Sequence, residues 1–583
     1  MSATGERLSC PWRVMSFGIL LVIYAALSAC SSDVAVAAPD PGEVTVILKD
    51  LDPKIKVAIG RVIETGETAI LNQSKLSFHA CGDGHRVSVW APGYYIKTLT
   101  CNGSVDGYYE ISMERIDPAD NRSYPWVSTV DSPYGCAICH SDGFKLNEAT
   151  EWKADGHSKS FISQLFLTTY LGTNVNGTSG QRTLWGFAPD GSTYRLPPDS
   201  NQLDYGPGYQ LDYPGASGNC AFCHAPAALG ATNQEVNLTA LISNSRGERV
   251  NAAAEGVTCD VCHKAIDVAL DTQGLPYVDR PGILSFSFLR PNTGGQFAAG
   301  PWSHLATSNT EMRRTCSPIF SESSFCAPCH YAKFSGVEVY ASYKEWLESP
   351  YSLPNQSFRS CQDCHMQSPL VIQNTTPIAA RGACSPENTS FQDFSHNMMK
   401  RDNTGMPILI QRAATVSISA NREDGKIKVN VNVINTAAGH KFPTDSPLRH
   451  LILVVEARDQ NGVMLSQVDG PRIPDWGGTG GSPQDYAGRP GMIYANILKD
   501  KDTSMVPSVA YWNLTVPAWQ GSDTRLLPNQ DTPSQYFFVA PSQGDVKITA
   551  QLFYRSAFMD ILRKKGLSPD DILVNYAEFE ILE

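Results

Sequence analysis

Five copies of one short pattern, Cys-x-x-Cys-His, constrain this 583-residue chain more than any other feature. The stretch EGVTCDVCHK at 255–264 contains one copy. Two thiols three positions apart lie on one helical turn and can both add to the vinyl groups of a single haem, and the next residue can ligate its iron. A chain of this composition would contain on the order of 0.01 such copies by chance. The pattern therefore predicts covalently bound c-type haem.

The five units use ten of the 16 cysteines and predict five haems. The expected thioether cysteines are Cys136, Cys139, Cys220, Cys223, Cys259, Cys262, Cys326, Cys329, Cys361 and Cys364. The expected proximal iron ligands are His140, His224, His263, His330 and His365. Zinc and disulfides explain the pattern less well, because five units pair badly around tetrahedral zinc and neither needs a histidine after every second cysteine.

Seven further histidines are available for the opposite faces of the irons. We expect distal ligation by His157, His304 and His396, which lie in a polar region with no apolar core, and by His440, whose loop contains Gly439 and Pro443. His450 fits a buried strand better. The fifth distal ligand stays open between His79, His85, a methionine, a neighbouring chain and an iron left free for chemistry.

The N-terminal sequence is typical of a lipoprotein signal. Arg7 and Arg13 precede an apolar run that ends in LSAC at 27–30, a pattern that resembles a bacterial lipobox. We expect a signal peptide at 1–29, lipidation of Cys30 and a small, polar tether at 30–42; an ordinary signal cleaved near 35–38 is the alternative. Ser31 favours the outer membrane. Haem attachment outside the cytoplasm agrees with export.

Four cysteines remain after lipid and haem are assigned and the signal is removed. In an oxidising compartment an even remainder suggests two disulfides, and Cys81–Cys101 with Cys316–Cys384 is the economical pairing. Free buried thiols are the alternative.

The chain divides into three parts after the tether. Residues 43–125 alternate β-formers with Gly and Asn turns and predict an N-terminal β-sandwich module. Residues 130–405 hold all five units, are rich in Gly, Pro, Ser and Asn, and predict a mostly irregular and α-helical core packed around haems. Residues 410–583 predict a C-terminal β-sandwich, with apolar residues alternating over 427–433 and 546–554 and a second hairpin over 451–465. The shortest gaps, from His224 to His263 and from His330 to His365, predict neighbouring haems.

Residues 130–460 resemble the multihaem c-type cytochromes of the tetrahaem cytochrome and hydroxylamine oxidoreductase lineage. The resemblance rests on GVTCDVCHK, on YKEWLESPYSLPNQSFRSCQDCHM, on SHNM and on GHKFPTDSP. In that family Trp-x-x-Ser-x-His supplies a distal histidine. WKADGH at 152–157 matches with Asp155 at the serine position, whereas WLESPY at 346–351 ends in Tyr351. GHKFPT at 439–444 implies His440 as a ligand, with Asp445 where glycine is usual.

The expected function is electron transport along a chain of haems at the outer membrane, on its periplasmic or extracellular face. An electron carrier is favoured over an enzyme; the alternatives are a reductase of nitrite, hydroxylamine or a sulfur oxyanion with one open haem, and a filament-forming cytochrome. Expected partners are periplasmic or outer-membrane cytochromes, a porin conduit and an extracellular metal acceptor. The formal charge of −12 argues against nucleic acid.

Overall fold

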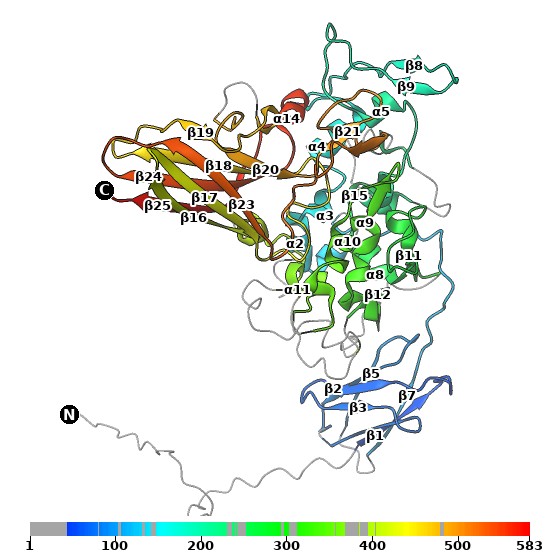
Figure 1. The fold of residues 1–583 in the computed structure, drawn as a ribbon. Helices are drawn as coiled ribbons and strands as arrows, with labels where there is room; N and C mark the ends of the chain where they lie inside the picture. The colour runs from blue at the N-terminus through cyan, green and yellow to red at the C-terminus, as the bar shows by residue number, and fades with distance from the viewer. Residues whose placement is uncertain are drawn as a thin grey trace, which may run out of the picture.

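A computed structural model describes residues 44–583 with internal gaps. Its gaps are residues 80, 103–106, 131–134, 142–146, 230–235, 240, 242–251, 293–296, 302–311, 356, 368–383, 385–393, 403 and 479–482. The signal, Cys30, the tether and His304 therefore lie outside the described residues. Figure 1 shows an N-terminal β unit and a C-terminal sandwich on either side of a region of short elements.

The N-terminal unit is a small sandwich of two sheets with strand orders β4-β1-β7 and β3-β2-β5-β6. Its strands are β1 Val44–Lys49, β2 Ile59–Val62, β3 Thr68–Ile70, β4 Lys75–Phe78, β5 Arg86–Trp90, β6 Lys97–Thr100 and β7 Tyr108–Ser112. Alternating side chains of β1, such as Val44 and Val46, pack with Phe78, Val87 and Val89 in one buried core.

Residues 130–405, which hold the five Cys-x-x-Cys-His units and are called the haem-unit region below, are built from short elements. Its α-helices are α2 Glu148–Ala154, α3 Gly156–Lys159, α4 Gln164–Leu171, α5 Tyr209–Asp212, α6 Ala221–His224, α8 Cys259–Lys264, α9 Ala327–His330, α10 Ser342–Leu347 and α11 Cys361–His365. Two-stranded sheets are formed by β8 Trp185–Phe187 with β9 Thr193–Arg195, β10 Ala265–Val268 with β11 Phe286–Phe288, β12 Phe297–Gly300 with β13 Arg313–Cys316, and β14 Ala332–Phe334 with β15 Val337–Tyr340. Among the described α-helices, α4 is the longest, with eight residues.

Seven 3₁₀ helices are also described in this region. They are η1 Cys136–Ile138, η2 Pro226–Ala228, η3 Ala252–Ala254, η4 Gly282–Ser285, η5 Pro318–Ser321, η6 Ser323–Phe325 and η7 Pro350–Ser352. Such short pieces cannot by themselves bury a large apolar core. The expectation that haems supply this core stays a prediction.

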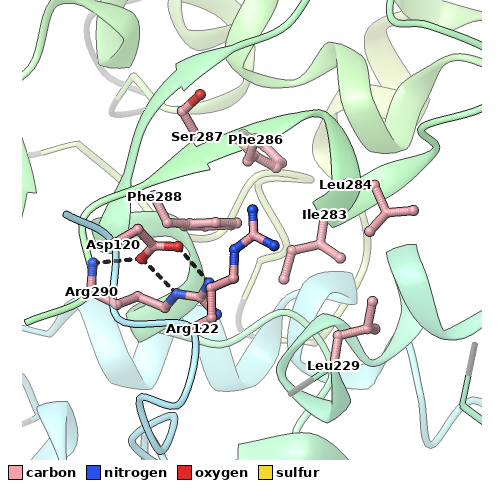
Figure 2. Close-up of a pocket in the computed structure, with 9 residues that line it drawn as sticks. All are labelled: Asp120, Arg122, Leu229, Ile283, Leu284, Phe286, Ser287, Phe288 and Arg290. Carbon is pink, nitrogen blue, oxygen red and sulfur yellow. Dashed lines mark hydrogen bonds and ion pairs between the residues drawn. The ribbon is translucent and has the colours of Figure 1, made fainter. Parts of the chain in front are cut away.

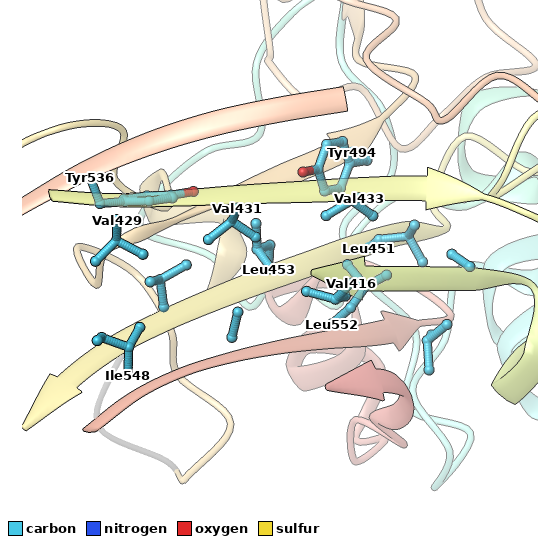
Figure 3. Close-up of a cluster of buried hydrophobic side chains, with 14 of the residues drawn as sticks. Val416, Val429, Val431, Val433, Leu451, Leu453, Tyr494, Tyr536, Ile548 and Leu552 are labelled. Carbon is cyan, nitrogen blue, oxygen red and sulfur yellow. The ribbon is translucent and has the colours of Figure 1, made fainter. Parts of the chain in front are cut away.

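The C-terminal sandwich packs the sheet β16-β17-β23-β19 on the sheet β20-β18-β24-β25. Its elements are α13 Ile408–Arg412, β16 Ala414–Glu423, β17 Lys426–Asn435, β18 His450–Asp459, β19 Gln467–Asp469, η8 Asp475–Gly477, β20 Gly491–Ala495, β21 Leu498–Asp500, β22 Thr515–Pro517, β23 Asp531–Val539, β24 Val546–Arg555, α14 Met559–Lys565 and β25 Ile572–Ile581. Figure 3 shows Val429, Val431 and Val433 facing Leu453 and Ile548 across the core.

The strand patterns of this sandwich follow the sequence closely, with one difference. β16 and β17 form the expected hairpin around Asp424 and Gly425, which both have positive φ. The expected hairpin over 451–465 is short: the chain returns at the Arg458–Met464 bridge, and β19 then crosses to pair with β23 in the other sheet. β18 instead pairs with β20 and β24, because its buried residues need partners on both edges.

Buried polar contacts hold the sandwich on the haem-unit region. The Arg525 guanidinium lies 2.7 Å from the Glu345 carboxylate of α10, with both side chains at most 7 % exposed. Lys565, at the end of α14, donates to the carbonyl oxygens of Thr168 and Pro207 at 3.1 and 2.7 Å. These contacts join the sandwich to α10, to α4 and to the segment before α5.

Two disulfides join the pairs expected from the sequence. Cys81 and Cys101 close the N-terminal unit, and Cys316 and Cys384 lie beside it. Cys316 and Cys384 pack with Trp90 and Ile96 in one buried cluster. The second disulfide therefore lies where the N-terminal unit meets the haem-unit region.

Candidate haem-attachment sites

Each Cys-x-x-Cys-His unit lies on or beside a single helical turn. The third unit is capped by Thr258, whose hydroxyl accepts a hydrogen bond from the Val261 amide. The fifth has a capping box formed by Ser360 and Asp363. A helical turn places the first cysteine, the second cysteine and the histidine on one side, as attachment to one cofactor requires.

All ten cysteines of these units are free of disulfides. Thiols of different units also meet. The Cys136 thiol lies beside that of Cys259, the Cys326 thiol beside that of Cys361, and the Cys329 thiol beside that of Cys223, so that each shifts the pKa of its neighbour. The charge of Cys329 also raises the pKa of the buried Cys262, after the larger effect of burial. The five units therefore form one connected group with the fourth at its centre.

The short gaps in sequence predicted that the second unit lies beside the third and the fourth beside the fifth. Of these two pairs, only the fourth and fifth units touch directly in the described part of the chain, through Cys326 and Cys361. The second unit, by contrast, lies beside the fourth through Cys223 and Cys329, and the third is near enough for the charge of Cys329 to raise the pKa of Cys262. Sequence spacing measures the length of the connection, whereas the packing of other segments decides which units lie side by side.

Three expected distal histidines each face a proximal histidine. His157 faces His330 with ring centroids 6.2 Å apart, and the interplanar angle is 64°. The same arrangement places His396 opposite His263 at 6.3 Å and 28°. The third pair is His440 and His365, at 6.4 Å and 15°.

The spacing of these pairs fits an iron between two imidazoles. A first-row metal ion lies about 2 Å from each ligating imidazole nitrogen, so the two ring centroids are about 6 Å apart when the half-width of each ring is added. The residues present therefore fit haem at three units, with both axial positions taken by histidine.

The Nδ1 atoms of the eight described ligand candidates lie within hydrogen-bonding distance of oxygen acceptors. The pairs are His140–Glu148 (3.0 Å), His157–Asp155 (2.7 Å), His224–Ser160 (2.8 Å), His263–Ala299 (2.7 Å), His330–Asp445 (3.0 Å), His365–Met398 (2.9 Å), His396–Phe394 (3.0 Å) and His440–Lys441 (2.8 Å). An oxygen acceptor holds the proton on Nδ1, so the neutral ring presents the lone pair of Nε2. This is the tautomer that an iron ligand needs.

Burial keeps two of these imidazoles neutral. It lowers the pKa of His263 and of His365 to about 4, against the opposing hydrogen bonds to Ala299 and Met398. A neutral imidazole is the form that ligates metal.

One short helix orients three histidines. On α2, the Glu148 carboxylate accepts from His140 Nδ1, and the Glu151 carboxylate accepts from the His396 amide at 2.7 Å. Asp155, one residue past the helix, accepts from His157. Positions 148, 151 and 155 share one helix face, so the carboxylates reach neighbouring ligands together. None of these carboxylates was expected from the sequence to orient a histidine, although Glu148 and Glu151 just before the Trp-x-x-Asp-x-His segment, and Asp155 within it, were a usable signal.

Asp445 has a role that the sequence analysis also missed. Its φ is 59°, in the region that favours glycine, which agrees with the glycine expected at this position. Its carboxylate accepts from His330 Nδ1 at 3.0 Å and from the Ser342 amide at 3.1 Å. Burial alone would lower the pKa of His330, but the hydrogen bond and charge of Asp445 raise it to about 9.

The segment at 346–351 keeps the turn of the expected ligand motif with a different side chain. The Ser349 hydroxyl accepts from the Tyr351 amide at 3.2 Å, as the Asp155 carboxylate accepts from the His157 amide at 3.0 Å. Tyr351 packs against Gly439 and its hydroxyl accepts from Asn529 at 3.3 Å. Tyr351 therefore fills a packing position beside His440.

Two proximal histidines have no facing histidine among the described residues. The His140 ring is held by Glu148, and the His224 ring stacks on Phe166 at 3.9 Å and 7°. His304, expected as a distal ligand, lies outside the described residues.

The other histidines lie elsewhere. His79 is exposed and paired with Glu67, and His85 Nδ1 accepts from the Gly82 amide, both in the N-terminal unit. His450 is buried in the sandwich, stacked on Phe558.

A cavity of about 250 Å³ lies beside the second and fourth units. Its wall includes Ile283, whose neighbour Gly282 packs on Cys223, and Phe286, whose ring contacts Phe325 just before the fourth unit. Figure 2 shows the Arg122 guanidinium extending over this cavity. An arginine among aromatic walls can bind a carboxylate.

Within the described residues, no three His, Cys, Asp or Glu side chains converge as a protein-only metal site would. Of the helices described, none has the length and apolar character to cross a membrane.

Comparison with known proteins found no matching family model and no matching curated protein. Among solved structures, the chain is similar to a penta-heme cytochrome c552 from Thermochromatium tepidum, with 20 % identity, coverage of 76 % of this chain and 97 % of that chain, and a TM-score of 0.48. A match to the Fcho1 Mu homology domain of Danio rerio with bound Eps15 peptide has 8 % identity, covers 30 % of this chain and 50 % of that chain, and has a TM-score of 0.12.

Proposed function

We propose that this chain is a pentahaem c-type cytochrome that carries electrons outside the cytoplasm. The observation that carries the proposal is the set of three facing imidazole pairs, each joined to a Cys-x-x-Cys-His unit with free thiols. Bound haem supplies reversible one-electron iron chemistry. At three units two imidazoles of the chain would hold the iron between them, which would leave no place there for a substrate and favours a carrier.

The contacts between units support transport along the chain. Thiols of neighbouring units touch at Cys136–Cys259, Cys326–Cys361 and Cys223–Cys329. Each thiol would be bonded to a porphyrin edge, so touching thiols bring attached groups close together. The connected grouping, with the fourth unit central, suits passage of electrons between several entry and exit points.

Location and partners are part of the same proposal. Lipid on Cys30 would hold the chain at the outer membrane, on the periplasmic or extracellular face. Its partners would be other redox proteins, among them periplasmic or outer-membrane cytochromes and a porin conduit, with extracellular metal as a possible acceptor. The net charge of −12 suits cationic partners.

A mass measurement of the exported chain tests the cofactor content. We expect five covalently bound haems and a lipid-modified N-terminus, together with a Soret absorbance that survives denaturation. Changing both cysteines of the third unit, Cys259→Ala with Cys262→Ala, should remove one equivalent. A mature chain without covalently bound pigment would contradict the proposal.

Removing a distal histidine tests the axial assignment. His157→Ala, His396→Ala and His440→Ala should each convert one low-spin centre to high spin in the electron paramagnetic resonance spectrum of the oxidised protein. His79→Ala is the matched control and should leave the spectrum unchanged, because its ring pairs with Glu67 in the N-terminal unit. Unchanged spectra of all three ligand variants would refute the pairing.

A reductase with one open iron is the second candidate. It is favoured because the chain has too few available histidines to place two on each of five irons. Three distal positions are filled, and His79, His85 and His450 have other surroundings. Only His304 then remains for the two irons at His140 and His224. At least one iron is therefore ligated by a residue other than a histidine of this chain, by a neighbouring chain as in a filament, or by nothing.

Carbon monoxide separates these outcomes in the reduced protein. Binding of one equivalent, with a high-spin centre before addition, supports an open iron and hence the reductase. A centre that becomes high spin only on dilution supports a ligand from a neighbouring chain. Five low-spin centres that bind no carbon monoxide support the carrier alone.

A further inference from the structure

The hairpin β8–β9 and the segment after it expose large apolar side chains on one projecting part of the molecule. We define the 184–203 surface by six residues. They are Leu184, Trp185, Phe187, Tyr194, Leu196 and Leu203. Phe187 is 78 % and Leu203 is 73 % exposed. In Figure 1, β8 and β9 project away from the rest of the chain. In the β8–β9 register Trp185 and Phe187 lie on one face of the hairpin, and Leu184, Tyr194 and Leu196 lie on the other, so the projecting hairpin is apolar on both faces. Exposed apolar residues grouped on one projecting element mark interaction sites in soluble proteins.

The hairpin is held rigidly even though its two strands alone would be marginally stable. The Arg195 guanidinium is 7 % exposed and forms ion pairs with Asp500 at 2.5 Å and with Asp502 at 3.5 Å. Asp502 also accepts from the Arg195 amide at 3.1 Å. These ion pairs hold the hairpin in one position, although its apolar side chains face solvent and are not packed in a core. A hairpin held in this way suits a preformed contact surface.

A continuous series of ring contacts runs from this surface to the second Cys-x-x-Cys-His unit. The series is Trp185–Tyr213 at 6.2 Å, Tyr213–Tyr209 at 5.5 Å, Tyr209–Tyr170 at 5.6 Å, Tyr170–Phe166 at 6.1 Å and Phe166–His224 at 3.9 Å. Packed rings shorten the gaps that an electron has to cross. The 184–203 surface is therefore joined by ring contacts to His224, the expected iron ligand of the second unit.

We propose that the 184–203 surface is the docking site of a small, basic redox protein that exchanges electrons with this chain. This inference rests on the proposed function. The net charge of −12 attracts a basic partner over long range, and Asp190 lies exposed in the turn of the hairpin. The same charge repels a second copy of this chain and an anionic lipid surface.

The exchange is a one-electron step. The reduced chain loses one electron and the ferric partner gains it, with no bond formed or broken and no proton moved. The apolar side chains provide the short-range contact, and the surrounding charge speeds the encounter.

The test uses the full-length holoprotein and a ferric, basic monohaem cytochrome c as probe. Binding is measured by calorimetry at low salt, and hydrogen exchange with mass spectrometry maps the contact without any electron transfer. We expect protection of residues 184–203 and an affinity that falls as salt is raised. Phe187→Ser with Leu203→Ser should weaken binding at least ten-fold and slow electron transfer to the probe by a similar factor.

The matched control replaces two exposed apolar residues at the far end of the sandwich. Val463→Ser with Val468→Ser removes side chains that are 59 % and 51 % exposed, and it should leave affinity and rate unchanged. Equal effects of the two double variants, protection elsewhere, or no binding of the probe to the unaltered chain would overturn the docking site. So would self-association or binding to phosphatidylglycerol vesicles that depends on Phe187 and Leu203.

Haem content and reduction by dithionite are measured on every variant. A chain without haem refutes the proposed function itself. A fully loaded and reducible chain on which the Phe187→Ser, Leu203→Ser variant binds normally refutes only the docking site.

Discussion

Single carboxylates decide how the imidazoles of this chain are oriented. Asp445 and Asp155 occupy positions where the resembling family has glycine and serine, and each accepts a hydrogen bond from the Nδ1 of a ligand candidate. A charged acceptor on Nδ1 makes an imidazole a stronger electron donor to its metal than a neutral acceptor does. Asp155 and Asp445 would therefore strengthen the electron donation of both imidazoles of the His157–His330 pair to a bound metal.

Asp445→Gly tests this effect at one residue. Glycine tolerates the φ of 59° but cannot accept from His330, so the midpoint potential of one haem should rise by on the order of tens of millivolts. Potentials are measured by spectroscopic redox titration. Asp424→Gly is the matched control, because Asp424 also has a positive φ and lies in the turn of the β16–β17 hairpin. Identical titrations of the two variants would show that Asp445 has no electronic role.

At the scale of elements, a short helix and a strand fix histidines in two different settings. α2 places carboxylates against His140, His396 and, just past its end, His157. β18 begins with His450, which is buried against Phe558 and Trp476. The first arrangement fits the proposed ligation, and the second is a core position whose ring has to stay neutral.

His450 predicts a pH dependence of the stability of the sandwich. Burial lowers its pKa to about 3, from about 6.5 in the unfolded chain. The folded state then binds fewer protons between these values, so stability falls as the pH drops through this window, by about 1.4 kcal/mol per pH unit from this residue. His450→Phe should remove this slope, as measured by calorimetric unfolding between pH 4 and 7. His79→Phe, on the surface, should retain it; a slope that His450→Phe leaves intact would assign it to other groups.

At the scale of the whole molecule, the sandwich completes the haem-unit region. It supplies His440 opposite His365 and Asp445 behind His330, and Arg525 pairs with Glu345 on α10. Thr444 also donates to the Glu345 carboxylate at 2.6 Å. The loop at 440–445 is thus held from both sides of the interface.

Breaking the buried pair at this interface should be costly. Arg525→Met leaves the Glu345 carboxylate buried without its cation and should lower the free energy of unfolding by about 3–5 kcal/mol. Adding Glu345→Gln should recover part of the loss. Lys547→Met breaks the exposed Lys547–Glu578 pair and should cost less than about 1 kcal/mol. Chemical denaturation of the three variants measures the difference, and equal losses for the buried and exposed pairs would contradict it.

Local sequence patterns were enough to predict the attachment units and the buried strand faces of the sandwich. The thiols and the histidine of each unit lie within five consecutive residues, so their chemistry is visible without a fold. The alternation of Ile427, Val429, Val431 and Val433 likewise indicated one buried strand face, because side chains of a strand alternate between its two sides. The resemblance marked His157 and His440 as ligands, and position in a polar region marked His396.

Only the tertiary structure decided which imidazoles face each other and what orients them. His330 and Asp445 are 115 residues apart and meet because the sandwich docks on α10. The ring series from Trp185 to His224 is likewise assembled from four separate segments. The chemistry of each Cys-x-x-Cys-His unit is a property of adjacent residues, whereas the histidine that faces a unit depends on long-range packing that no local pattern encodes.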